Sequence, residues 1–185
     1  TNPLMWDLLA SVLREVEDSS LLMQNGDPWL DDPKGYFARK ARREMERRGV
    51  DPGRVTFIGS RPLEERLRLL GEEADVALDS YPYNGCTTTC ECLWMGVPVV
   101  TLRGRSLVSR VSYSLLARTG LAELAAETPE DYVRAAVHLT SDLGRLSRLR
   151  AGLRARVMPL TQGETGAREF EAAFRSMWRR WCAAA

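Results

Sequence analysis

The stretch YPYNGCTTTCECLWMGVPVVT, from Tyr81 to Thr101, gathers side chains that could hold a ligand. Three consecutive threonines follow a glycine-bearing turn, and the acid Glu91 comes one turn into the helix that this pattern predicts. A helix N-terminus offers unpaired N–H groups and about half a positive charge, which favours phosphate. Gly85 lets backbone approach a ligand closely because it has no Cβ. With a carboxylate able to accept from both hydroxyls of a ribose, this corner fits a nucleotide.

The same residues also match a purely structural pattern. Thr88 and Glu91 have the spacing of a capping box, in which the acid folds back onto the residue that caps the helix. Such boxes are far commoner than nucleotide sites, so spacing alone favours the structural interpretation. Both interpretations stay open on this pattern: a ligand site or a helix cap.

Around this corner the chain alternates between helical and extended patterns. Apolar residues recur at helical spacing over about residues 3–17, and Gly49 is placed to end a later polar helix. Strands are predicted at 20–24, 54–59, 75–80 and 97–102. Further helices are predicted at about 33–48 and 62–71, from the threonine-rich corner to about Met95, and at 106–118. Short, mostly apolar strands between helices are typical of a parallel sheet covered on both faces. The predicted fold class is therefore α/β, a Rossmann-like parallel sheet flanked by helices.

The remainder of the chain reads as a helical extension. Thr128 is expected to cap a helix with Pro129 in its first turn and Asp131 completing a start that resembles a capping box. A second helix is predicted at about 143–157. The last helix carries an apolar stripe, predicted to be core: Phe170, Ala173, Phe174, Met177, Trp178 and Trp181. We expect one domain over 1–185, with an α/β core to about 125 and the extension over about 128–185.

Composition excludes several classes of function. The chain has 185 residues, 28% of them charged, and a net charge of +1, so no global field draws it to nucleic acid or to anionic membrane. The basic run Arg39, Lys40, Arg42, Arg43, Arg47 and Arg48 is interrupted by acids and reads as a solvated face. No apolar run reaches membrane-spanning length, and the charged first twenty residues do not fit a signal peptide.

The four cysteines and the single histidine, His138, lack the paired spacing of a zinc site, so no metal is expected. Reduced thiols in a cytoplasm are the simpler interpretation of the cysteines, and we expect a cytoplasmic protein.

A longer stretch carries a specific resemblance. The segment ADVALDSYPYNGCTTTCECLWMGVPVVTLRGRSLVSRVSYSLLARTGLAEL resembles the carboxyl-terminal catalytic part of the O-linked N-acetylglucosamine transferase and SPINDLY family. The resemblance continues through ETPEDYVRAAVHLTSDLGRLSRLRAGLR and is weakest in the amino-terminal third. It implies an inverting glycosyltransferase of the GT-B fold, in which two Rossmann-like domains enclose the active site. This chain would be the carboxyl-terminal domain, without the amino-terminal half and the tetratricopeptide repeats.

The resemblance also implies roles for particular residues. Thr87 and Thr88, with the backbone at Gly85 and Cys86, would hold the diphosphate, and Glu91 the ribose. The loop at Arg61 and Pro62 would meet the uracil.

Three positions depart from the family pattern. Gln24 stands where the family usually has a lysine that contacts the diphosphate. Arg66 stands where it usually has a histidine beside the base, and Cys86 where it has threonine or histidine. Such a lysine stabilises charge that develops on the leaving diphosphate, and its loss would cost on the order of 2.7–4 kcal/mol of barrier. Arg66 could compensate in part, because a guanidinium can stack on a base or reach phosphate. No catalytic residue is assigned within the chain.

The implied function is binding of a UDP-sugar, such as UDP-GlcNAc, for transfer to Ser or Thr of proteins. No further cofactor or metal would be needed. The isolated chain is expected to be inactive, because catalysis would also need the amino-terminal half. That half would be supplied in cis, as part of a longer chain, or in trans, as a separate partner. The alternative is a degenerate module that binds a nucleotide or a protein without turnover.

Overall fold

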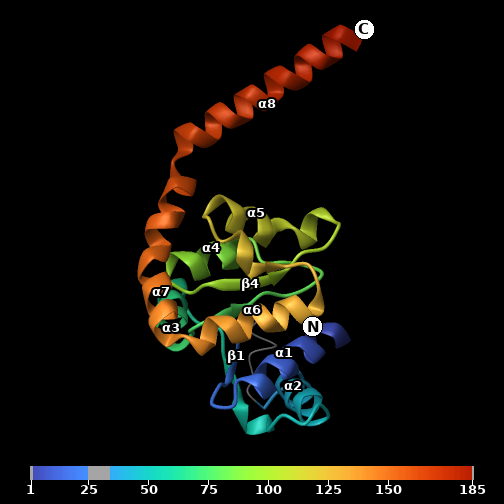
Figure 1. The fold of residues 1–185 in the computed structure, drawn as a ribbon, viewed down its shortest axis with the longest axis vertical. Coiled ribbons are helices and arrows are strands. Elements are labelled where there is room, and N and C mark those ends of the chain that lie inside the picture. Colours follow the sequence, from blue (N-terminus) through green and yellow to red (C-terminus); the bar gives the residue numbers. More distant parts are fainter. Residues whose placement is uncertain (1, 25–33, 185) are drawn as a thin grey trace.

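The computed structural model describes residues 2–24 and 34–184. Figure 1 shows a body of strands and helices from which the last helix projects as an arm. The strands are β1 (Leu21–Gln24), β2 (Val55–Ile58), β3 (Ala77–Leu78), β4 (Val99–Leu102) and β5 (Ala125–Ala126). The α-helices are α1 (Pro3–Glu15), α2 (Tyr36–Glu46), α3 (Leu63–Glu73), α4 (Thr87–Trp94), α5 (Val111–Arg118), α6 (Pro129–Ser141), α7 (Leu143–Val157) and α8 (Gly163–Ala184). Short 3-10 turns, η1 to η4, lie at Pro52–Arg54, Leu107–Ser109, Ala122–Leu124 and Met158–Thr161.

Among the described residues all strand pairs are parallel, but the strands form two sheets rather than one. β1 pairs with β2, in a register that runs from Leu21 opposite Val55 to Gln24 opposite Ile58. β4 lies between β3 and β5 in a second, three-stranded sheet. Helix α6 contacts β4 from one face and α4 contacts it from the other, as Figure 1 shows. The predicted class, parallel strands flanked by helices, is confirmed.

The strands differ from the prediction in extent and in burial. The strand expected over 75–80 contributes only Ala77–Leu78 to the ladder, and β5 was not predicted because two alanines carry no strand pattern. All four residues of β4 are buried, as expected of a strand covered on both faces. The apolar run at 20–24 likewise predicts a buried strand, but β1 is half-buried and its Gln24 is exposed. The reason is that, within the part of the chain that the structure describes, β1 pairs only with β2 and also lines a cleft.

The core is built on the apolar stripe of α1, which packs against α6 and α2. Trp6 is only 2% exposed, and Met45 of α2 and Leu93 of α4 are fully buried. Each fully buried side chain of this size contributes about 1.5–3 kcal/mol of hydrophobic free energy. Among the described residues, no helix has the length and apolar character that crossing a membrane requires.

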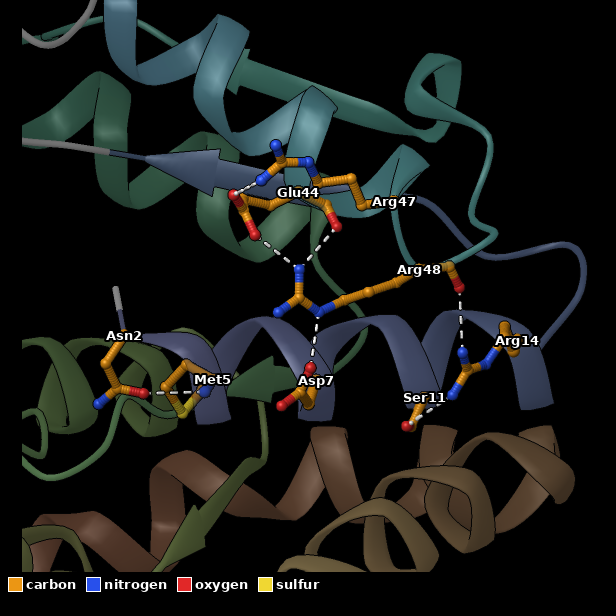
Figure 2. A network of polar contacts seen from close by, with 8 residues as sticks. All are labelled: Asn2, Met5, Asp7, Ser11, Arg14, Glu44, Arg47 and Arg48. Carbon is orange, nitrogen blue, oxygen red and sulfur yellow. Dashed lines mark hydrogen bonds and ion pairs between the residues drawn. The ribbon is translucent and has the colours of Figure 1, made fainter.

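A polar network fastens α1 to the end of α2 (Figure 2). Arg48 donates from Nε to Asp7 at 2.7 Å and from Nη1 to the Glu44 carboxylate at 2.6 Å. Arg14 donates to the Arg48 carbonyl oxygen at 3.0 Å. Because Arg48 is half-buried and donates to a carboxylate on each of two helices, it fixes the relative position of α1 and α2 better than a fully exposed ion pair would. Part of the basic run of α2 is therefore structural.

Two of the local signals in the sequence are confirmed. The Thr128 hydroxyl accepts from the Asp131 N–H at 3.1 Å and donates to the Asp131 carboxylate at 2.9 Å, which caps α6. Gly49 follows α2 with a φ of 74°, a conformation that costs glycine little. The helix predicted from residue 33 begins at Tyr36, and Pro33 lies outside the described residues.

The prediction that the apolar stripe of the last helix is core is wrong. No residue of α8 is buried among those that the structure describes. The large apolar side chains of the stripe are between 61% and 69% exposed: Phe170, Phe174, Met177, Trp178 and Trp181. The helix is formed as predicted, but it leaves the body, and no other described element covers its apolar stripe (Figure 1).

Candidate functional site

The corner between β3 and α4 is organised by a buried acid, Asp79, which is 8% exposed. Its Oδ1 accepts from the backbone N–H groups of Ser80 at 2.9 Å and Gly85 at 2.8 Å, and its Oδ2 accepts from the Thr101 hydroxyl at 2.6 Å. The Tyr132 hydroxyl donates to the Asp79 carbonyl oxygen at 3.0 Å. One carboxylate therefore ties both ends of the turn to β4.

Other buried polar groups fix the start of α4. Asn84, 1% exposed, donates from Nδ2 to the Ser80 carbonyl oxygen at 2.9 Å. The Ser112 hydroxyl of α5 donates to the Gly85 carbonyl oxygen at 3.0 Å and lies 2.9 Å from the buried Thr89 hydroxyl. The geometry of the turn is thus set by α5 as well as by the sheet, which preorganises the corner.

Gly85 is required here by packing. A Cβ at this position would lie 2.6 Å from the hydroxyl oxygens of both Thr88 and Thr89, and 3.3 Å from Asp79 Oδ1. A carbon–oxygen contact of 2.6 Å is a steric clash, so any residue other than glycine would displace the two threonine hydroxyls. The sequence suggested that Gly85 allows a ligand to approach, but the described atoms that approach it are these hydroxyls.

The three threonines have different environments. α4 begins at Thr87, and its capping residue, Cys86, makes no side-chain capping bond. Thr87 and Thr88 are exposed in the first turn of the helix, and Thr89 is buried. Two hydroxyls are therefore presented beside the free N–H groups of a helix N-terminus, the arrangement that suits an anionic oxygen.

The capping-box interpretation of Glu91 is wrong. Arg66 of α3 donates from Nη1 to Glu91 Oε2 at 2.6 Å and from Nη2 to Oε1 at 2.8 Å, so the carboxylate turns to α3 rather than to the helix start. The Glu91 hydrogen bond raises the pKa of the Arg66 guanidinium above its ordinary value. Both side chains are largely shielded, with 24% of Arg66 and 17% of Glu91 exposed. A bidentate pair of this kind holds the carboxylate in one orientation.

A cleft of about 990 Å³ opens at this corner and contains most of the predicted site. It is lined by all of the predicted residues except Pro62 and Cys86: Gln24, Arg61, Arg66, Gly85, Thr87, Thr88 and Glu91. Pro62 and Cys86 are the exposed capping residues of α3 and α4, beside the lining residues. The residues come from the carboxyl ends of β1, β2 and β3, where open α/β sheets bind ligands.

Sequence reasoning missed the residues that hold the site in shape. Asp79, Asn84, Ser112 and Tyr132 make the hydrogen bonds described above, yet none was singled out. An acid at the end of an apolar strand, as in DVALDS, was the one available signal. Among the described residues no cluster of His, Cys, Asp and Glu side chains could hold a metal ion.

Comparison with known proteins identifies the family. The model of "Glycosyl transferase family 41" matches residues 8–162. A probable UDP-N-acetylglucosamine–peptide N-acetylglucosaminyltransferase SPINDLY from Eustoma exaltatum subsp. russellianum is 47% identical over 140 residues, which are 75% of this chain and 15% of that protein. The SPINDLY protein of Solanum lycopersicum is 41% identical over the same shares.

Solved structures agree with this assignment. A mutant of the O-GlcNAc transferase of Thermobaculum terrenum superimposes with a TM-score of 0.87 and 39% identity, covering 100% of this chain and 35% of that one. The chain therefore spans only a minor part of the relatives that it matches, and its match to the family model extends over most of its own length. Because the family model matches most of the chain and the solved relative superimposes on all of it, the chain belongs to glycosyl transferase family 41.

Proposed function

We propose that this chain is the donor-binding half of an inverting protein O-glycosyltransferase, which holds a UDP-sugar for transfer to Ser or Thr of proteins. The observation that carries the proposal is the cleft at the carboxyl ends of the strands, where the hydroxyls of Thr87 and Thr88 lie with Glu91. Its volume of about 990 Å³ is within the range of small-molecule sites. The names of the relatives, which are peptide N-acetylglucosaminyltransferases, support UDP-GlcNAc as the donor.

In the proposed complex the diphosphate lies at the amino end of α4. The exposed hydroxyls of Thr87 and Thr88 and the helix N–H groups donate to its oxygens. Gln24, exposed at the end of β1 and lining the same cleft, adds an uncharged donor. No metal or further cofactor is part of this proposal.

The nucleoside lies toward α3. Glu91 accepts from the ribose hydroxyls, and the loop at Arg61 and Pro62 meets the uracil. The Arg66 pair does not prevent this, because an ionised carboxylate has about four acceptor positions and Arg66 uses two of them. Arg66 thereby acts as a positioning residue that holds the Glu91 carboxylate in one orientation at the cleft.

Binding of UDP by the 185-residue chain tests the proposal. In calorimetry, Thr88→Ala should weaken UDP binding on the order of tenfold, since one hydrogen bond to a charged group is lost. Thr161→Ala, which removes an exposed threonine far along the chain in η4, is the matched control and should leave binding unchanged. The site assignment is wrong if the folded wild-type chain shows no binding at millimolar UDP, or if the two threonine variants behave alike.

A second candidate function is a module that binds the nucleotide without turnover. The glutamine at position 24 favours it, because an uncharged group stabilises a leaving diphosphate less than a lysine would. Labelled UDP-GlcNAc and a Ser/Thr-rich peptide, with and without the amino-terminal half of a related enzyme, distinguish the two. We expect no transfer by the chain alone, because placing an acceptor needs the other half. Transfer only with the added half supports the enzyme, and UDP binding without transfer in either mixture supports the module.

A further inference from the structure

The buried acid Asp79 lies beside the corner at which the diphosphate is placed above. It lines the cleft together with Gly85, Thr87 and Thr88. Its Oδ1 and the Thr88 hydroxyl oxygen lie 3.3 Å and 2.6 Å from the same point, the position that a Cβ on Gly85 would take. An oxygen of this acid and a hydroxyl that would donate to phosphate are therefore close neighbours, because Gly85 has no side chain to separate them.

The side chain of Asp79 is the acceptor in each of its hydrogen bonds to the described residues. Oδ1 accepts from the N–H groups of Ser80 and Gly85, and Oδ2 accepts from the Thr101 hydroxyl. An ionised carboxylate can accept at both oxygens, whereas an amide accepts at only one of its two terminal atoms. The Gly85 N–H is occupied by Asp79, so it is not among the groups that are free to bind phosphate. These three bonds fix the turn that leads into α4.

The charge of Asp79 has no cation beside it. No ion pair joins Asp79 to a described residue, in contrast to Glu91, which Arg66 holds. Burial first, and then the charge of Asp79, raises the pKa of the Tyr132 hydroxyl, so this charge acts on its neighbours. Neutral donors stabilise a carboxylate but leave its net charge in place, and a shielded site strengthens its repulsion of other anions. A diphosphate at this corner would be within range of that repulsion.

We propose that Asp79 is a positioning residue with two opposed effects on the diphosphate, an inference that rests on the proposed function. Its acceptor oxygens hold the turn in the conformation that presents Thr87, Thr88 and the N–H groups of α4, which strengthens binding. Its negative charge repels the phosphates, which weakens binding. The repulsion is greater for UDP than for a UDP-sugar, because the terminal phosphate of UDP has one more ionisable oxygen. Asp79 therefore favours replacement of the product UDP by a new UDP-sugar.

Two substitutions separate the two effects. Asp79→Asn keeps an acceptor oxygen for the N–H groups of Ser80 and Gly85 and removes the charge, whereas Asp79→Glu keeps the charge and displaces the acceptor oxygens by one methylene. In calorimetry at low salt, Asp79→Asn should bind UDP about three- to tenfold more tightly than the wild type. Asp79→Glu should bind UDP on the order of tenfold more weakly. Asp142→Asn is the matched control, since this acid also accepts a backbone N–H but does not line the cleft, and it should leave binding unchanged.

Ligands of different charge distinguish repulsion from a general change in the fold. The gain in Asp79→Asn should be largest for UDP, smaller for UDP-GlcNAc and absent for uridine. It should also shrink in high salt, because ions screen the repulsion. An equal change for all three ligands would show a purely structural role and overturn the proposal. Weaker binding of UDP by Asp79→Asn than by the wild type would overturn it as well.

Hydrogen exchange of the Gly85 amide reports the positioning effect without any ligand. Exchange should stay slow in Asp79→Asn and become about tenfold faster or more in Asp79→Glu. If Asp79→Glu does not fold, Asp79→Asn still decides, because faster exchange of Gly85 in that variant contradicts positioning by the acceptor oxygen. No binding of UDP by the wild-type chain would overturn the proposed function together with this inference. Wild-type binding that Asp79→Asn leaves unchanged would overturn this inference alone.

Discussion

Helices α1 and α8 share a sequence pattern and differ in environment. Both carry large apolar side chains at helical spacing, including tryptophan. Trp6 of α1 is 2% exposed between α6 and α2, whereas Trp178 of α8 is 64% exposed on an arm that leaves the body (Figure 1). Periodicity therefore predicts that a helix forms and which face is apolar, but not what covers that face. The following predictions test this difference, from the largest expected effect to the smallest.

Removing a tryptophan should separate the two helices most clearly. Trp6→Ala leaves a cavity in a packed core and should lower the free energy of unfolding by about 3–5 kcal/mol. Trp178→Ala loses only its stacking on Trp181, 5.3 Å away between ring centroids, and should cost about 1 kcal/mol or less. Urea unfolding followed by circular dichroism measures both. Losses of similar size would mean that α8 is covered in solution.

Arginine ion pairs to α1 and within α8 should differ in the same direction. Arg48, 19% exposed, holds Asp7 of α1 and Glu44 of α2 (Figure 2), and Arg48→Ala should cost about 2 kcal/mol. Arg175 lies 3.5 Å from Glu171 on the exposed surface of α8, and Arg175→Ala should cost about 0.3–0.5 kcal/mol. Unfolding in low and in 1 M salt adds a check, because the exposed pair should lose its contribution in salt. A small effect at Arg48 would show that α1 is not fastened to α2 by this network.

The cysteines of the two regions should differ least in their effect on the free energy of unfolding, and this effect should depend on pH. Burial raises the pKa of the Cys92 thiol from 9.0 to about 12, while Cys182 is exposed on α8. Above pH 9 the unfolded chain loses this proton and the folded chain keeps it, so stability falls as pH rises toward 12. Between pH 8 and 10 the fall should be about 1 kcal/mol smaller in Cys92→Ala than in the wild type. Cys182→Ala is the control, and a wild-type fall equal to that of Cys92→Ala would contradict the raised pKa of the Cys92 thiol.

The candidate site shows a similar division. Gln24, the pair Arg61 and Arg66, and the pair Thr88 and Glu91 come from three separate segments of the sequence. The resemblance to a family predicted that they share one site. The structure brings them to one cleft. The partner of Glu91 could not be predicted from spacing, because the ion pair joins residues 25 positions apart on two different helices. The capping box was a reasonable local interpretation that a tertiary contact replaced.

Local chemistry alone determined much of this protein. Gly49 ends α2 because glycine adopts a positive φ at little cost, and Thr128 caps α6 because its hydroxyl reaches the free N–H three residues on. Apolar residues at helical spacing mark α1 and α8 equally well. These features depend on residues within about one turn of each other, so the order of residues contains the information they need.

Only the tertiary structure decided which surfaces are covered and which polar groups meet. Asp79 accepts hydrogen bonds from Gly85 and Thr101, and Arg66 donates to both oxygens of Glu91. The residues next to each acid in the sequence do not predict these partners. The exposure of Trp178 and the separation of β1 from β3 likewise depend on where whole elements lie. The physical reason is that burial and long-range hydrogen bonding depend on the packed arrangement of the whole chain. Segments far apart in the sequence can pack against the same neighbour, and a local pattern does not determine which of them does so.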